Sequence, residues 1–135
     1  MKIERFEDIE AWQAGRELTR GIYRATKLQQ FAKDFGLVDQ IRRATVSITS
    51  NIAEGFERGG DKEFVHALTL AKGSCGELRS QLYVALDEEY ITKTQFDELA
   101  GQALAASRLL GGFIKYLQSS TLRGTKFRRR DDARP

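Results

Sequence analysis

Apolar side chains recur along most of the chain at intervals of three and four residues, the spacing of one face of an α-helix. The region 37–78 shows this most clearly, because it begins with an apolar stripe made of Leu37, Ile41, Ala44 and Ile48. A second stripe runs beside it and consists of Thr45, Thr49, Ile52 and Phe56. No charged residue falls between Ala44 and Ala53, whereas a surface helix normally shows water a charged face. We therefore expect this helix to be covered on more than one side.

The same periodicity predicts four helices, over about residues 8–28, 37–57, 62–89 and 93–119. The last of them carries a sustained heptad seam, formed by Phe96, Leu99, Ala103, Ala106, Leu110, Phe113 and Leu117. Long amphipathic helices joined by short connectors predict an all-α fold, an up-down-up-down antiparallel four-helix bundle over residues 1–122. Residues 123–135 follow as a basic C-terminal tail that we expect to be mobile, since Phe127 is its only core-type residue.

Helix ends are marked by residues with known capping chemistry. Asp8 and Asp61 are predicted to cap the first and third helices, by accepting hydrogen bonds from first-turn amides. Thr92 and Gln95 have the spacing of a capping box at the start of the fourth helix. The second helix starts at Leu37 or one turn earlier at Asp34, and the pair Gly59–Gly60 ends it.

Three uncharged stretches predict that the bundle assembles further. Residues 44–53 carry no charge, residues 99–114 carry only Arg108, and residues 64–76 carry only Lys72 apart from His66. A monomeric bundle is expected to show a charged stripe on every helix, and large uncharged patches rarely stay in contact with water. We therefore predict a homo-oligomer.

The positive charge of the chain is concentrated at its end. Residues 123–135 hold six basic and two acidic side chains, whereas the rest of the chain holds 16 basic and 17 acidic ones. Since the body has a net charge of only −1, the high isoelectric point is no evidence that the body binds nucleic acid. RNA affinity is therefore expected mainly from Arg123, Lys126, Arg128, Arg129, Arg130 and Arg134. The alternative is a solubilising, disordered extension.

The composition also bears on where the protein works. No apolar run approaches the ~20 residues of a membrane span, and Met1–Arg5 lacks the apolar core of a signal peptide. Cys75 is the only cysteine, so it forms no internal disulfide, which fits a reducing compartment. These features predict a cytoplasmic protein without a membrane partner.

Little in the chain points to catalysis. His66 is the only histidine, so a histidine-based metal cluster or catalytic dyad within one chain is not expected. Glu54 invites comparison with di-iron bundles, but these need two Glu-x-x-His motifs on facing helices, and a chain with one histidine cannot supply two. The run from Gly73 to Gly76 does not have the spacing of a phosphate-binding loop, and its small residues instead favour close helix approach. We predict a non-enzymatic protein with no cofactor and no metal.

Four polar residues of the second helix have two possible roles each. Asn51 and Glu54 lie in a helix that is otherwise covered, so they either satisfy backbone or neighbouring-helix groups or contact a second subunit or a ligand. Arg42 and Arg43 are candidates for phosphate contact. One of the two arginines is expected to pair with Asp39 instead.

These residues also carry a resemblance to a known family. The chain is similar to the four-helix-bundle proteins encoded in 23S rRNA intervening sequences, over about residues 3–118. The matching motifs are Gln40-Ile41-Arg42-Arg43-Ala44, Ser47-Ile48, Asn51-Ile52-Ala53-Glu54-Gly55-Phe56, Arg58, Glu63-Phe64 and Ala71-Lys72-Gly73-Ser74. The opening Phe6-Glu7-Asp8-Ile9 with Trp12 also resembles the family. Two departures are Asp61, where the family often has Ser, and a first connector without the usual Pro.

The resemblance implies a ring-like homopentamer in which Asn51, Glu54, Gly55, Arg58, Gly73 and Ser74 serve as interface or structural motif residues. It also implies similarity to the accessory proteins of diversity-generating retroelements, which bind nucleic acid and a reverse transcriptase. We therefore predict a non-enzymatic, homo-oligomeric bundle associated with RNA. The alternative is a protein-interaction scaffold, whose ring binds a partner protein without touching nucleic acid.

Overall fold

The computed structural model describes the backbone of residues 3–123 and the side chains of residues 3–119. A short 3₁₀ helix, η1 (Phe6–Asp8), precedes five α-helices. These are α1 (Glu10–Ala25), α2 (Gln29–Lys33), α3 (Phe35–Arg58), α4 (Asp61–Asp87) and α5 (Lys93–Arg123). Within this part of the chain there is no strand, so the all-α prediction is confirmed.

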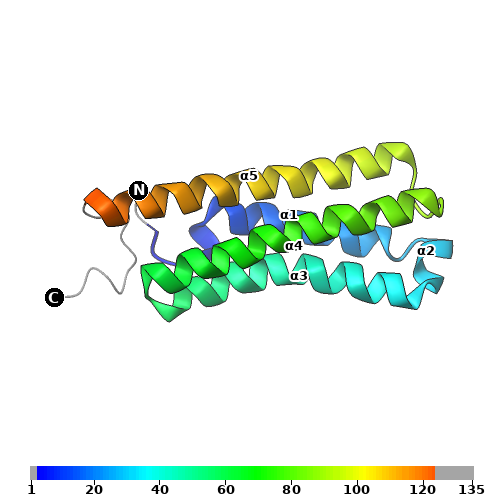
Figure 1. Ribbon diagram of the computed structural model, residues 1–135. Helices are drawn as coiled ribbons and strands as arrows, with labels where there is room; N and C mark the ends of the chain where they lie inside the picture. Colours follow the sequence, from blue (N-terminus) through cyan, green and yellow to red (C-terminus); the bar gives the residue numbers. More distant parts are fainter. Residues whose placement is uncertain (1–2, 124–135) are drawn as a thin grey trace.

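The four long helices alternate in direction and lie side by side (Figure 1). Each packs against two neighbours, in the order α1, α3, α4, α5 and back to α1. The short helix α2 lies at the end of the bundle where α1 passes into α3 (Figure 1). The result is an up-down-up-down bundle of four long helices, as the periodicity predicts, with one additional short helix in the first connector.

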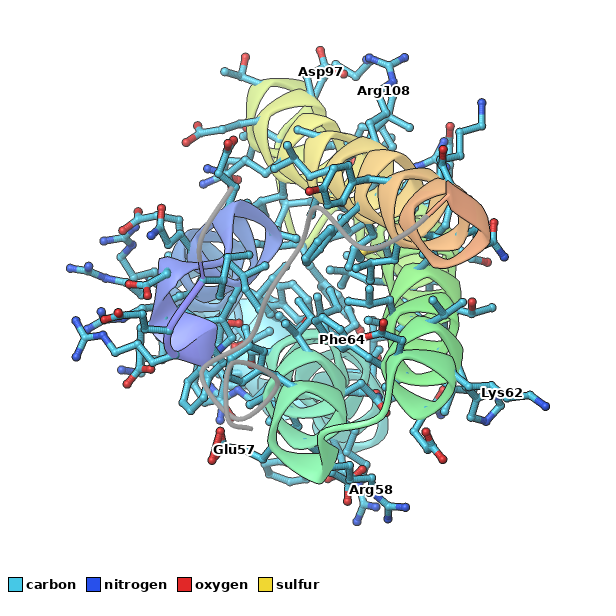
Figure 2. All side chains as sticks on the ribbon, turned by 90° about the vertical axis from the view of Figure 1, so that its left-hand side faces the viewer. Glu57, Arg58, Lys62, Phe64, Asp97 and Arg108 are labelled. Atoms are coloured by element: carbon cyan, nitrogen blue, oxygen red, sulfur yellow. The ribbon has the colours of Figure 1, made fainter. Side chains whose placement is uncertain are left out.

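The core consists of the stripes that the periodicity selects. Ile41, Ala44 and Ile48 of α3 are buried, as are Ala103, Ala106 and Leu110 of the α5 seam. Phe64 of α4 points into the space between the helices (Figure 2). Its ring packs edge-on against Phe56 of α3 and Phe113 of α5, with centroid separations of 5.9 and 5.5 Å. One aromatic cluster therefore joins three of the four long helices.

The predicted capping box of Thr92 and Gln95 and the helix end at Gly59 are confirmed, and the earlier of the two predicted starts of α3 is the observed one. The Asp34 carboxylate accepts a hydrogen bond of 3.1 Å from the Leu37 amide, so α3 begins a turn earlier than Leu37. At the start of α5, the Gln95 amide donates to the Thr92 hydroxyl at 3.1 Å, and the Thr92 amide donates to the Gln95 side chain at 2.8 Å. Gly59 ends α3 with φ of 90°, a left-handed conformation that glycine adopts without strain.

The other two caps are wrong. Ile9, not Asp8, precedes α1, and the Asp8 carboxylate accepts hydrogen bonds from the Glu4 and Arg5 amides instead. The reason is that residues 6–8 form η1, so Asp8 closes an earlier turn. Gly60 is the cap residue of α4, and Asp61 is the first residue inside that helix. An acidic side chain at this position still interacts favourably with the positive end of the helix dipole.

The helix bounds differ most in the first connector. The first helix ends at Ala25 and not at 28, and residues 29–33 form α2. Phe31 explains this, because its buried ring stacks on Tyr90 with the centroids 5.2 Å apart. The predicted ranges 37–57 and 62–89 become 35–58 and 61–87, and the last helix runs four residues past the predicted 119, across the expected boundary at 122.

One long-range hydrogen bond ties the two connectors at this end of the bundle. The Tyr90 hydroxyl, just after α4, donates to the Asp34 carboxylate at 2.9 Å. This hydrogen bond raises the pKa of Tyr90 above its ordinary value. The same carboxylate therefore caps α3 and holds the α4–α5 connector in place. Among the helices described, none is both long and apolar enough to cross a membrane.

We predict that Leu110→Ala lowers the free energy of unfolding by about 2–5 kcal/mol, because the side chain is fully buried and its loss leaves a cavity. Leu109→Ala is the matched control. Leu109 is 36% exposed, so its truncation removes far less buried surface. Urea denaturation at one protein concentration measures both. Equal midpoints for the two variants would contradict the packing of the α5 seam.

Candidate functional site

The predicted motif residues gather on two adjacent helices. Arg42, Arg43, Asn51, Glu54, Gly55 and Arg58 lie on α3, and Gly73 and Ser74 lie on α4. These two helices pack against each other along their length. Arg123 is the last residue of α5, and its side chain lies outside the described ones. The tail residues Lys126, Arg128, Arg129, Arg130 and Arg134 also lie outside the described part of the chain.

Asn51 belongs to a chain of hydrogen bonds that links α3 to α4. Its side-chain amide donates to the backbone carbonyl of Ser47 at 2.8 Å and to the Ser47 hydroxyl at 2.9 Å. The Ser47 hydroxyl lies 2.9 Å from that of Ser74, which also donates to the carbonyl of Leu70 at 3.2 Å. Asn51, Ser47 and Ser74 thus form a chain of hydrogen bonds that joins α3 to α4.

Gly55 is required by the close approach of the same helices. A Cβ atom at this position would overlap that of Ala67 and lie 3.2 Å from the Phe64 ring. Gly73 differs, because a Cβ added there would meet no atom within 4 Å. The expectation that the small residues from Gly73 to Gly76 allow close helix approach therefore holds at Ser74, which lies against Ser47, but not at Gly73, which faces open space within one chain.

The arginines of α3 fall into two kinds. Arg43 pairs with Asp39 at 3.0 Å, as predicted, and Arg58 pairs with Glu54 at 3.7 Å. Both pairs are exposed, and exposed pairs contribute little to stability. Arg42 instead turns toward α1, where its Nε donates to the Thr26 hydroxyl at 2.9 Å.

The guanidinium of Arg42 also stacks on an aromatic ring. Its central carbon lies 4.4 Å from the centroid of Tyr23, a geometry that attracts a cation to the ring face. Sequence reasoning missed both Tyr23 and Thr26, since no local spacing relates them to a residue on another helix. Arg42 is thus held in a fixed orientation by neutral groups and keeps its positive charge uncompensated by any carboxylate within ion-pair distance among the described residues.

The outer side of α3 is hollowed in two places. One hollow of about 680 Å³ is lined by Tyr23, Asp39, Arg42, Arg43, Val46, Ser47, Ser50, Asn51 and Glu54. The second, of about 560 Å³, is lined by Asn51, Glu54, Gly55, Arg58, Lys62, Glu63, His66, Ala67 and Leu70. Asn51 and Glu54 line both. The two hollows therefore form one continuous surface, which we call the α3–α4 surface.

Comparison with protein families agrees with this arrangement. The family model described as 23S rRNA-intervening sequence protein matches residues 7–112. The chain belongs to this family. The match includes every motif residue of the α3–α4 surface and ends before the basic tail.

A solved structure of another protein has the same fold as this chain. It is a protein of unknown function from the S23 ribosomal protein family of Bacteroides thetaiotaomicron, 24% identical in sequence, with a TM-score of 0.70. The likeness covers 78% of this chain and 95% of the other. Among curated proteins, no match was found.

The groups with catalytic potential in this family member are few. Burial raises the pKa of the Cys75 thiol to about 11, although Lys72 and Arg79 act in the opposite direction. The thiol is therefore protonated at neutral pH, and a protonated thiol is a poor nucleophile. His66 is exposed on α4. Within residues 3–123, no three His, Cys, Asp or Glu side chains lie close enough to hold a metal ion.

We predict opposite effects for alanine at the two motif glycines. Gly55→Ala is expected to cost about 1–3 kcal/mol, because the added methyl group overpacks the contact between α3 and α4. Gly73→Ala is expected to raise the stability of the single subunit by up to ~1 kcal/mol, since its site is open within one chain and alanine favours a helix. Denaturant titration of both variants beside the unmodified protein provides the measurement. A stabilised Gly55→Ala would show that the helices do not approach as described.

Proposed function

We propose that this protein is a non-enzymatic, homo-oligomeric helical bundle that associates with RNA. The observation that carries the proposal is Arg42, whose guanidinium is fixed by Thr26 and Tyr23 at a surface hollow. Among the described residues, no carboxylate lies within ion-pair distance of that guanidinium. A cation held in this way suits phosphate, because little side-chain freedom remains to be lost on binding. Arg43, paired with Asp39, is less available. The proposal places the protein in the cytoplasm, where an RNA partner is present.

Assembly is supported by the outer faces of α3 and α4. Val46 is 38% exposed and Leu70 is 48% exposed, and they lie on the two helices that the Ser47–Ser74 contact joins. Gly73 and Gly76 face open space in the middle of α4, although a glycine inside a helix costs roughly 0.5–1 kcal/mol relative to alanine. A second copy packed on these positions accounts for both features. A ring of identical subunits, with five favoured by family resemblance, closes such contacts.

The basic tail supplies the second part of the proposed RNA affinity. Residues 123–135 carry a net charge of +4, and several tails on one ring act together, because the first contact raises the effective concentration for the next. Phosphate contacts position a protein without reading bases, so this binding is expected to be largely indifferent to sequence.

The runner-up is a scaffold whose ring binds a partner protein without touching nucleic acid. The exposed side chains of Val46 and Leu70 favour it, since an apolar patch suits a protein surface better than a phosphate backbone. A relation to retroelement accessory proteins, which bind both nucleic acid and a reverse transcriptase, would unite the two functions.

We predict that light scattering at micromolar concentration gives a mass several times the 15.3 kDa of one chain. Leu70→Asp is expected to lower that mass, because it places a charge in the proposed interface. Leu28→Asp is the control, since Leu28 is similarly exposed but lies in the α1–α2 connector. A mass near 15.3 kDa for the unmodified protein would refute the assembly.

We predict that glutamine at Lys126, Arg128, Arg129 and Arg130 weakens RNA binding by the full-length protein. Each phosphate contact on a single strand contributes about −0.7 to the slope of log affinity against log salt. Loss of four contacts therefore flattens the slope by about 3. Mobility shifts of a structured RNA over a series of salt concentrations measure this. Equal slopes would remove the tail from RNA binding, and no binding by the unmodified protein would favour the scaffold.

A further inference from the structure

The solvent side of α1 and of the connector that follows it carries a row of basic side chains, although the body as a whole is nearly neutral. Residues 10–33 contain five basic side chains and two acidic ones, Glu10 and Glu17. Arg16, Arg20, Arg24 and Lys27 are all exposed and follow one another at intervals of four, four and three residues. This spacing keeps them on one broad face, with steps of about 6 Å along the axis for each interval of four. Figure 2 shows side chains with nitrogen and with oxygen ends extending into solvent from this side of α1.

Most of these cations have no acidic partner. Arg20 pairs with Glu17 at 3.2 Å, and both side chains of that pair are more than half exposed. For Arg16, Arg24 and Lys27, no carboxylate lies within ion-pair distance among the described residues. Their charges therefore act together on the solvent beside α1 and raise the local concentration of anions.

Two aromatic rings of α1 support the row. The guanidinium of Arg16 lies 5.9 Å from the centroid of the Trp12 ring, and that of Arg42 lies 4.4 Å from Tyr23. Trp12 itself is held edge-on against Phe6 with the centroids 5.2 Å apart. The rings orient both arginines, so binding an anion costs less side-chain entropy than at a free surface arginine. Arg42 extends the row from α1 onto the neighbouring helix α3.

We propose that Arg16, Arg20, Arg24, Lys27 and Arg42 form a track that binds the sugar–phosphate backbone of an RNA strand along α1. This track rests on the RNA association proposed above and assigns a large part of the affinity to the folded body. The ligand class follows from the chemistry, since a row of regularly spaced cations matches a ligand with regularly spaced anions. All five residues lie within the part of the chain that the family model matches, whereas the basic tail lies outside it.

The test compares two variants of the full-length protein. Arg16→Gln with Arg24→Gln removes two cations from the track. Arg108→Gln with Lys115→Gln removes two exposed cations from α5 and serves as the matched control. Fluorescence anisotropy of a labelled uridine oligomer, measured over a salt series, gives affinity and slope. The track variant is expected to bind about tenfold more weakly, with a slope flatter by about 1.4, and the control to bind as the unmodified protein does.

Trp12 provides a second readout, because it is the only tryptophan and lies beneath Arg16. RNA binding is expected to change its fluorescence in the unmodified protein and in the tail variant, but much less in the track variant. Equal affinity and slope for the track and control variants would overturn the track while leaving the RNA association intact. Displacement of the RNA by polyglutamate at equal charge would assign the face to an acidic protein partner. Absence of RNA binding by the unmodified protein would reject both proposals.

Discussion

The close contact between α3 and α4 at Gly55 sets the geometry on which the rest of the structure depends. Without a side chain at this position, Ala67 and Phe64 come directly against the α3 backbone. That register places Ser47 beside Ser74 and turns Phe64 onto Phe56. The inner side of the contact therefore builds the aromatic cluster of the core, and the outer side builds the hydrogen-bonded floor of the α3–α4 surface. A larger residue at position 55 disturbs both at once.

The sequence predicts the fold well where residues close together in the chain determine the local structure. Helical periodicity identifies the buried seam of α5, and capping chemistry identifies the Thr92–Gln95 pair. Prediction fails where a residue far away in the sequence determines the local structure. Phe31 becomes buried because Tyr90, in the connector between α4 and α5, stacks on it. A segment that the sequence predicts as a connector therefore folds into α2. Asp8 is not the cap of α1, because a preceding 3₁₀ turn changes which amides it meets.

The candidate site shows the same division. The Arg43–Asp39 and Arg58–Glu54 pairs follow from a spacing of four along one helix, and both are present. The hydrogen bond between Arg42 of α3 and Thr26 at the end of α1 joins residues far apart in the sequence, and no sequence pattern predicts it. Net charge is also a poor guide, since acidic residues elsewhere in the body cancel the basic row of α1 in the total but not in space. The sequence signal that could have found that row is the spacing of its cations, at intervals of four, four and three residues from Arg16 to Lys27.

The order of helices around the bundle keeps the two proposed surfaces apart. Each helix contacts the next in the series α1, α3, α4, α5, so α1 and α4 lie diagonally across the core (Figure 2). If copies assemble through Leu70 and Gly73 of α4, the basic face of α1 points away from that contact. Arg42 lies between the two on α3, since it lines the α3–α4 surface while its guanidinium rests on Tyr23 of α1. Assembly and RNA binding are therefore compatible in one subunit, and a change at Arg42 is the one expected to affect both.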